Sequence, residues 1–333
     1  MSILASELLW LRPALQSDTV PAQNGGRCTQ TPIVSGVKNN LFPDVSAAQR
    51  AAGVEHWRKV FVAVKNADNL PLVDPRFSIE IGTPGDSHVL LYPGTLTDTL
   101  DQVTARPYGY GTLASAADAA DTEISVTTEA DFSVMTTKPF QVGDLVRIDA
   151  RTTVLDSGLS EYAEIDSVAY TGTALTLGLT AGLTNAYSAG AKIASVIEPG
   201  DLATAVSGKS MTGGVTYDDT AYPIAVPQIG GIYQTWTVTV TDHATGALSV
   251  SGDLIGAVGT GSTGVNLSPS NPNGGTYFTL DADGWGGTPA TGDTLVFTTS
   301  PAVCPLWYRR IVPAGAAAIS SDPVSVCVEG ESA

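Results

Sequence analysis

The chain has 333 residues, enough for two or three domains whose cores need no metal or disulfide. Hydrophobic residues make up 43% of it, which excludes an intrinsically disordered protein; only 15% are charged, and the formal net charge is −17. Specific binding of nucleic acid is excluded as well. It requires clustered Lys and Arg to neutralise the phosphates, and the 16 basic residues of this chain are scattered. A surface of Gly, Thr, Ala and Ser with few charges is typical of β-rich proteins that pack against copies of themselves.

The first segment, "MSILASELLWLRPALQ", contains the acidic Glu7 and lacks the basic start and cleavage site of a secretory signal. No apolar run approaches the roughly 18 residues of a membrane-spanning helix. Cys28, Cys304 and Cys327 form no CxxC pair, so free buried thiols are favoured, with a Cys304–Cys327 bond as the alternative. We therefore expect a soluble protein that is synthesised in the cytosol and does not enter a membrane.

One short helix is predicted at residues 46–52. Ser46 and Gln49 form a capping box, the residues between and after them are mostly alanine, and Gly53 is a helix stop. A helix of this length is not stable alone. We expect it to connect two strands and to be held by the sheet that follows it.

The strand that follows begins with the adjacent cations Arg58 and Lys59. Side chains alternate along a strand, so these two project to opposite faces, and one of them must approach the core or an interface. We take both as interface candidates, and the one that faces the interface is expected to pair with a neighbouring subunit's carboxylate; the alternative is a strand end where both stems reach water. Tyr108 and Tyr110, farther along the chain, are the other interface candidates.

Short runs rich in Val, Ile, Thr, Tyr and Phe recur between Pro and Gly residues along the whole chain. This pattern predicts an all-β protein made of two or three β-sandwich or small-barrel domains. The strands are expected at residues 57–64, 76–82, 88–94, 122–128, 144–150, 161–170, 174–179, 191–197, 233–242, 246–256, 276–282, 293–300 and 323–329.

Composition divides the chain into three expected units: an N-terminal sandwich at 1–120, a small barrel at 121–198 that is a possible decoration, and a C-terminal sandwich at 199–333. The loop at 95–121 is long and rich in small residues, which predicts an arm that contacts another subunit. "HWRKVFVAV" and "WYRRIVPAG" are alike and suggest related strands of two similar sandwiches. Whether the first and third units share a sheet stays open at this point.

Two segments match nucleotide-binding motifs in part, but neither has the features that such a site requires. "GTGSTG" at residues 259–264 matches GxGxxG, but the prolines that follow it cannot form the helix that a dinucleotide site requires. "SGKSMTG", around Lys209, lacks the first glycine of a P-loop, because Ala203 stands in its place. Both are expected to be loops.

Metal and catalytic sites are equally unsupported, and we assign no catalytic residue and no cofactor. Asp281 and Asp283 are a weak calcium candidate, although a turn between strands explains them better, since a third oxygen ligand is missing. No zinc spacing involves His56, His88 or His243, and no GxSxG elbow is present. The chain is therefore predicted not to be an enzyme. Three aromatic residues are the only candidates for a sugar-binding surface: Trp285, Trp307 and Tyr308.

The run "VSGVKNNLFPDVSAAQRAAGVEHWRKVFVAVKN…TPGD" resembles a pattern found in structural proteins of tailed-bacteriophage virions. Its parts are Asn39 to Phe42, the turn Pro43 to Ser46, the alanine-rich helix, the strand opening Trp57 to Lys59 and the Thr83-Pro84 turn. The stretches "VGDLVRID…AYSAGA" and "GDTLVFTT…LWYRRIVPAGA" are also similar to phage structural protein. The resemblance covers about half of the chain and identifies no functional residue.

This resemblance implies a virion component, and the tail tube is the first choice. Such proteins form stacked, usually hexameric rings around a lumen, so the implied partners are copies of this chain and other tail or head proteins. The acidic charge would let genome DNA pass without sticking. A baseplate, neck or head-decoration protein is the alternative within this class, and a carbohydrate-binding adhesin module is the alternative from another class.

Overall fold

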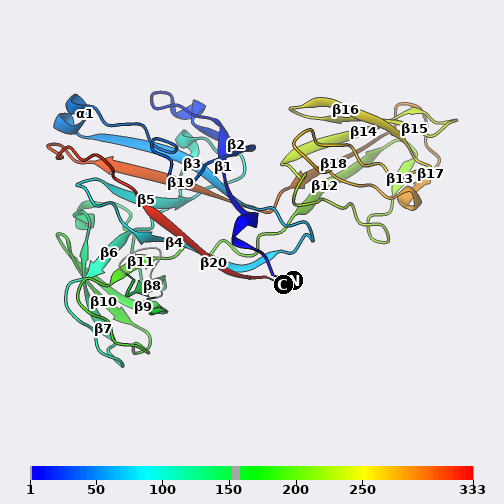
Figure 1. Cartoon of the computed structure of the whole chain (residues 1–333). Helices are drawn as coiled ribbons and strands as arrows, with labels where there is room; N and C mark the ends of the chain where they lie inside the picture. Colours follow the sequence, from blue (N-terminus) through cyan, green and yellow to red (C-terminus); the bar gives the residue numbers. More distant parts are fainter. Residues whose placement is uncertain (1, 152–157, 333) are drawn as a thin grey trace.

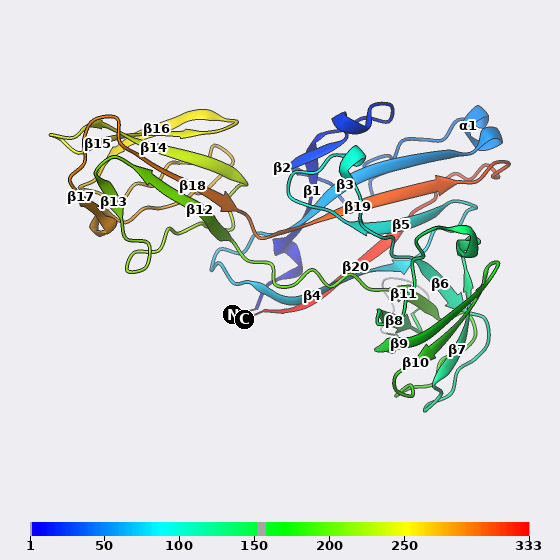
Figure 2. The ribbon, with the colours of Figure 1, turned by 180° about the vertical axis from the view of Figure 1, so that it is seen from behind.

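The chain folds into three β units, described by a computed structural model that covers residues 2–151 and 158–332. Figure 1 shows a central body, a barrel below it and a separate sandwich to one side. The predicted all-β class, with several sandwich or barrel units and one short helix, is confirmed. The chain leaves the body twice, first for the barrel and then for the sandwich, and returns to it after each (Figure 2).

The body is built on a five-stranded antiparallel sheet. Its strands, in the order β2-β1-β3-β19-β5, are β2 (Gly25–Pro32), β1 (Leu8–Leu15), β3 (Val54–Val64), β19 (Val303–Val312) and β5 (His88–Pro93). A second layer pairs β4 (Leu72–Ile81) with β20 (Ser325–Ser332). The segment that returns from the barrel joins this layer, because Phe77 bridges Ile197 and Leu72 bridges Leu202.

The predicted C-terminal unit at 199–333 needs correction, because its last two strands belong to the body. β19 lies next to β3 with Arg309 opposite Trp57, so the two similar segments are neighbours in one sheet and not strands of two sandwiches. β20 likewise pairs with β4. The first and third predicted units therefore do share a sheet, which residue patterns could not decide.

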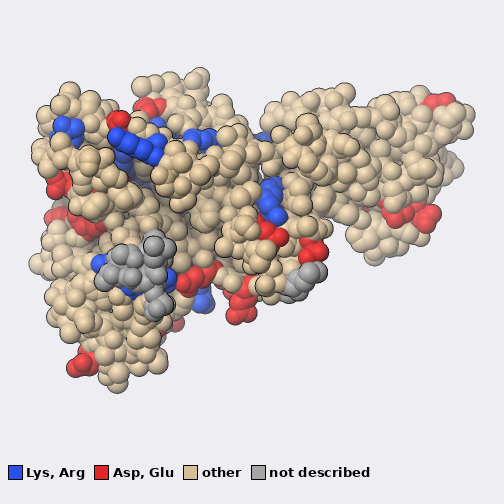
Figure 3. All heavy atoms as spheres, viewed as in Figure 1, with Lys and Arg blue, Asp and Glu red and all other residues tan. Residues whose placement is uncertain are grey.

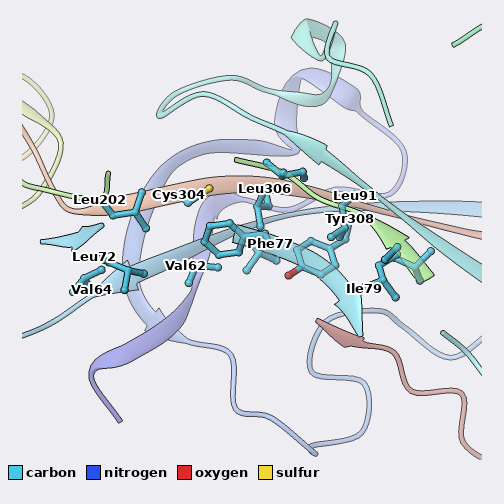
Figure 4. Close-up of a cluster of buried hydrophobic side chains, with 14 of the residues drawn as sticks. Val62, Val64, Leu72, Phe77, Ile79, Leu91, Leu202, Cys304, Leu306 and Tyr308 are labelled. Carbon is cyan, nitrogen blue, oxygen red and sulfur yellow. The ribbon is translucent and has the colours of Figure 1, made fainter. Parts of the chain in front are cut away.

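The main core fills the space between the two layers of the body (Figure 4). Val60, Val62 and Val64 of β3 face Phe77 and Ile79 of β4 across it. The opposite face of β3 is also buried, so that no residue from 60 to 64 is more than 1% exposed. Burial on both faces explains why β3 is a continuous apolar run without polar alternation.

The segment expected to be an intersubunit arm, 95–121, is packed within its own chain. Leu96, Leu100 and Val103 cover the second face of the body sheet. The residues Tyr110–Leu113 then form β6, the first strand of the barrel. Part of the segment therefore has partners within its own chain, while its contact with another subunit stays a prediction, and the barrel begins before the predicted boundary at 121.

The barrel is a closed ring of six strands around its own apolar core. In the order around the ring they are β10 (Ala174–Leu179), β7 (Glu123–Thr128), β6, β11 (Lys192–Ser195), β8 (Leu145–Asp149) and β9 (Ser160–Thr171). Closure leaves no free edge among the six described strands.

The sandwich has a five-stranded antiparallel sheet and a small two-stranded one. The large sheet runs β12 (Ala205–Thr212), β18 (Thr294–Ser300), β14 (Gln234–Asp242), β15 (Ala247–Gly252) and β16 (Gly256–Ser262); the small one pairs β13 (Val215–Tyr217) with β17 (Trp285–Gly287). Apolar residues of β14 alternate inward around the buried Trp236. The strand expected at 276–282 is present only as isolated bridges.

The helix α1 (Ala47–Ala52) confirms its predicted caps. The Ser46 side chain accepts a hydrogen bond from the Gln49 backbone, the Gln49 side chain accepts one from the Ser46 backbone, and Gly53 ends the helix at φ 80°.

The three cysteines are free, as the sequence favoured, and Cys304 is buried.

Candidate functional site

Arg58 projects into the edge of the main core, on the face opposite to Lys59, as alternation predicted. Its guanidinium donates to both carboxylate oxygens of Asp18 and, through Nε at 3.0 Å, to the backbone oxygen of Leu41. The Arg58 side chain is 4% exposed. The carboxylate thus comes from the same chain, in place of the neighbouring subunit that the sequence suggested.

Lys59 is completely buried on the second face of the sheet. Its Nζ lies 2.6 Å from Asp98 Oδ1 and donates to the backbone oxygen of Gly26 at 2.8 Å. The ammonium also lies 4.8 Å from the ring centroid of Phe61. Burial lowers the pKa of Lys59 and the bonds to Asp98 partly restore it. This cation, too, is satisfied internally and offers nothing to a neighbour.

Tyr108 and Tyr110 contact the barrel and the body of their own chain. Tyr110 is 6% exposed at the start of β6, and burial raises the pKa of its hydroxyl to about 12. Tyr108 is half-buried, with the guanidinium carbon of Arg106 4.0 Å from its ring centroid. These two interface candidates therefore also have internal partners.

The weak calcium candidate is a turn. Asp281 caps a 3-10 turn by accepting a hydrogen bond from the Asp283 backbone at 3.0 Å. Across residues 2–151 and 158–332, no group of three His, Cys, Asp or Glu side chains is arranged to hold a metal ion. The turn interpretation made from the sequence accounts for both aspartates.

The aromatic residues considered for a sugar site lie apart. Trp307 and Tyr308 point to opposite faces of β19, and both are buried. Trp285 belongs to the sandwich, where it packs edge-on against Tyr217. A shared sugar-binding surface is therefore ruled out for these three residues in this fold. The loops expected at the two nucleotide-like motifs need correction: residues 259–262 belong to strand β16, and Lys209 lies in strand β12.

A cavity of about 940 Å³ lies on the core side of the body sheet, next to β20. We call it the loop groove: its floor is Trp10, Val60, Tyr308 and Arg310, and its walls are the loops 33–45 and 316–326. Three aliphatic side chains on these walls are strongly exposed: Val34 at 57%, Val37 at 56% and Ile319 at 48%. Exposed apolar walls around a cavity are typical of a surface that binds a ligand or another protein chain.

Arg310, in the floor of the groove, is a buried cation with an incomplete set of partners. It donates to the backbone oxygen of Pro43 at 2.8 Å and lies 3.1 Å from His56 Nδ1, while its Nε has no hydrogen-bond partner among the described residues. Its guanidinium carbon lies 4.7 Å from the ring centroid of Phe42. Burial, together with the nearby Arg58, lowers the pKa of the guanidinium.

A second unusual group, Glu129, lies beside the turn at residues 83–87, where a smaller cavity opens. Burial raises the pKa of Glu129 to about 8, and Asp322 adds to the increase, while a hydrogen bond with the Thr83 backbone opposes it. The carboxyl group therefore keeps its proton to a higher pH than an ordinary glutamate does.

We predict that Glu129 makes the protein lose stability as the pH rises. Between its ordinary pKa of 4.5 and about 8, the native state holds a proton that the unfolded state has released, so the free energy of unfolding falls with pH in this window. In Glu129→Gln this loss should shrink by at least about 1.4 kcal/mol, the equivalent of one pKa unit. Urea unfolding at pH 5 and pH 8.5 measures it, with the exposed Glu164→Gln as control; equal slopes in both variants would contradict the assignment.

Strand β16 is an edge of the large sandwich sheet, and it has few of the features that usually prevent an edge strand from pairing with another chain. Among the described strands β16 pairs only with β15, and residues 254–280 contain no Asp, Glu, Lys, Arg or His. The exposed Leu254 and Val265 flank the strand at 68% and 60%. Figure 3 shows the upper part of the sandwich, where Figure 1 places β16, almost without charged side chains. An uncharged edge is a template for pairing with another chain.

No protein-family model matches the chain, and a search of curated proteins finds no relative. Function therefore has to be argued from the surfaces just described. Within the described residues, no helix is both long and apolar enough to cross a membrane.

Sequence reasoning missed both Arg310 and the groove. The one available signal was "WYRR" at residues 307–310, in which two consecutive arginines follow two large aromatic residues. Strand alternation puts Arg310 on the same face as Tyr308, but the loops that bury it come from residues 33–45, far away in the chain.

Proposed function

We propose that this chain is a self-assembling structural subunit of a tailed-phage virion, and that it belongs to the tail tube. The observation that carries the proposal is the uncharged, unpaired edge of β16 between exposed aliphatic residues. In a chain of net charge −17, two copies repel each other over most of their surfaces, so an uncharged edge is where they approach at least electrostatic cost.

Three further features support this function. The phage-like segment that begins at Asn39 forms one wall of the loop groove through residues 39–45, and Arg50 of the helix that follows also lines the groove. The net negative charge suits a lumen through which DNA passes without binding. The barrel and the sandwich are insertions into the body, which agrees with a ring-forming core that carries additional units.

The purified protein should form rings or stacked polymers, which negative-stain microscopy and light scattering detect. Baseplate, neck and head-decoration roles share the same chemistry and are separated from the tube by the virion fraction in which the protein sediments. A protein that remains monomeric at high concentration would end the proposal.

We predict that Gly259→Lys weakens assembly without unfolding the sandwich. A Cβ at Gly259 meets no atom within 4 Å, so the side chain fits, while a lysine in the middle of β16 blocks edge pairing. The dissociation constant for self-association should rise about tenfold or more, ~1.4 kcal/mol. Sedimentation velocity over a concentration series measures this change.

The matched control is Gly264→Lys, which adds the same charge to an exposed glycine just beyond the strand. If both variants assemble like the wild type, β16 is not an assembly edge.

A further inference from the structure

We propose that the loop groove receives an extended, carboxylate-bearing segment of a second copy of this chain, with Arg310 as its anchor. This inference rests on the proposed self-assembly and names the contact that it would use. The groove and β16 lie on different units, so the two surfaces are independent.

The first step is the missing counter-ion of Arg310. Its side chain is buried, and within residues 2–151 and 158–332 no carboxylate lies within 4.0 Å of it. Arginine is rarely buried without an anion, because removing its charge from water is costly unless it is paired. Here the guanidinium has one backbone oxygen, one imidazole and one aromatic ring, and its Nε is unsatisfied.

The nearby carboxylates of the same chain already have other partners. Asp18 is bound by Arg58, and Asp44 lies 3.6 Å from Lys38. Asp322 accepts from the backbone of Gly85 at 2.9 Å and from the hydroxyl of Ser87 at 2.5 Å. The other two carboxylates that line the groove are also engaged, Glu80 with Arg151 at 3.0 Å and Asp86 with the Ala317 backbone at 2.7 Å, so the missing anion is best supplied from outside the chain.

The second step is the form of the ligand. Residues 318–324, in one wall of the groove, make no backbone–backbone hydrogen bond in the described chain, so their C=O groups, and their N–H groups except at Pro323, have no backbone partner. The hydroxyl of Tyr308, 3% exposed in the floor, lies near the Trp10 indole but has no partner with hydrogen-bonding geometry among the described residues. Free backbone groups beside apolar pockets are the recognition mode for an extended peptide.

The third step is the identity of the partner. The chain has 33 carboxylates and only 16 Lys and Arg, so most of its acidic side chains lack a cation of their own. A second copy therefore brings an excess of carboxylates to the groove, and the exposed Val34, Val37 and Ile319 provide the apolar contact that an ion pair alone would lack.

The test compares self-association of the wild type with that of two groove variants by sedimentation velocity. Arg310→Gln removes the charge but keeps a donor for Pro43, and Ile319→Asp places a like charge on the exposed rim without touching the core. Both should raise the dissociation constant at least about tenfold. Val134→Asp, at an equally apolar and 79% exposed position of the barrel unit, is the matched control and should stay within about twofold of the wild type.

The outcomes separate this inference from the proposed function. If the wild type assembles and both groove variants assemble equally well, the groove assignment is overturned while the structural role stands. If the wild type stays monomeric at every concentration, both are overturned. A monomeric wild type whose Trp10 fluorescence responds to octanoate would assign the groove to a small carboxylate and would likewise overturn the role of a second copy.

Discussion

Replacing Lys59 with methionine should lower the free energy of unfolding of the body by about 3–5 kcal/mol, because it leaves the buried Asp98 without its cation. Asp98 would retain hydrogen bonds from the Thr95 backbone and from Trp307 Nε1 at 2.8 Å, which are too few to replace an ammonium at 2.6 Å. Guanidinium unfolding followed by tryptophan fluorescence measures the loss, since Trp307 reports directly on this site.

The double variant Lys59→Met, Asp98→Asn separates the loss of an ion pair from a loss of packing. Without either charge, the site should recover much of the lost stability, as buried pairs do when both partners become neutral. Lys38→Met, at a lysine that is 69% exposed, should change stability by less than about 0.5 kcal/mol. A Lys59→Met protein as stable as Lys38→Met would show that the pair contributes nothing to the fold.

The two cations at the start of β3 mark the limit of prediction from this sequence. Alternation correctly placed Arg58 and Lys59 on opposite faces, because it depends only on the strand. Their partners, Asp18 and Asp98, lie about forty residues away on either side. Nothing local specifies these pairs, and a pairing with a neighbouring subunit was an equally good expectation.

The strands, too, divide into those that the sequence predicts and those that it does not. Those rich in branched and aromatic residues, such as β3 and β14, were predicted because their cores impose apolar patterns. β12 and β16 were missed because their Gly, Ser and Thr residues form exposed edges of the sandwich sheet with little apolar burial. β19 and β20 were assigned to the wrong unit, since a strand's pattern shows that it pairs but not with which strand.

Charged residues fasten the barrel to the body, and their arrangement predicts the second large effect. Arg147 and Asp149 lie on the outer face of β8, both almost fully buried, and are hydrogen-bonded to each other. Arg147 reaches Glu329 of β20 at 2.9 Å, and Arg151 reaches Glu80 of β4 at 3.0 Å. Since Arg151 also contacts Asp149 at 2.6 Å, this one aspartate holds both arginines that cross from the barrel to the body.

Asp149→Ala should therefore destabilise the docked barrel by about 3–5 kcal/mol, because two guanidinium groups lose their shared carboxylate at a buried contact. Burial raises the pKa of Asp149, but hydrogen bonds from Arg151 and Arg147 outweigh it and hold this pKa below the usual 3.8. The carboxylate thus stabilises the native state above its ordinary pKa, and the contribution disappears as the pH falls through the lowered value. Wild-type protein should lose stability on acidification below about pH 4 by more than the variant does.

Proteolysis of the connections between barrel and body distinguishes undocking from general unfolding. The barrel has its own apolar core, so in Asp149→Ala it should remain folded while the connecting residues 106–109 and 198–204 become cleavable. Asp166→Ala removes an exposed carboxylate from the neighbouring strand β9 and should leave both connections protected. Equal protection in the two variants would mean that apolar contacts such as those around Ile197 and Leu202, and not the ion pairs, keep the barrel in place.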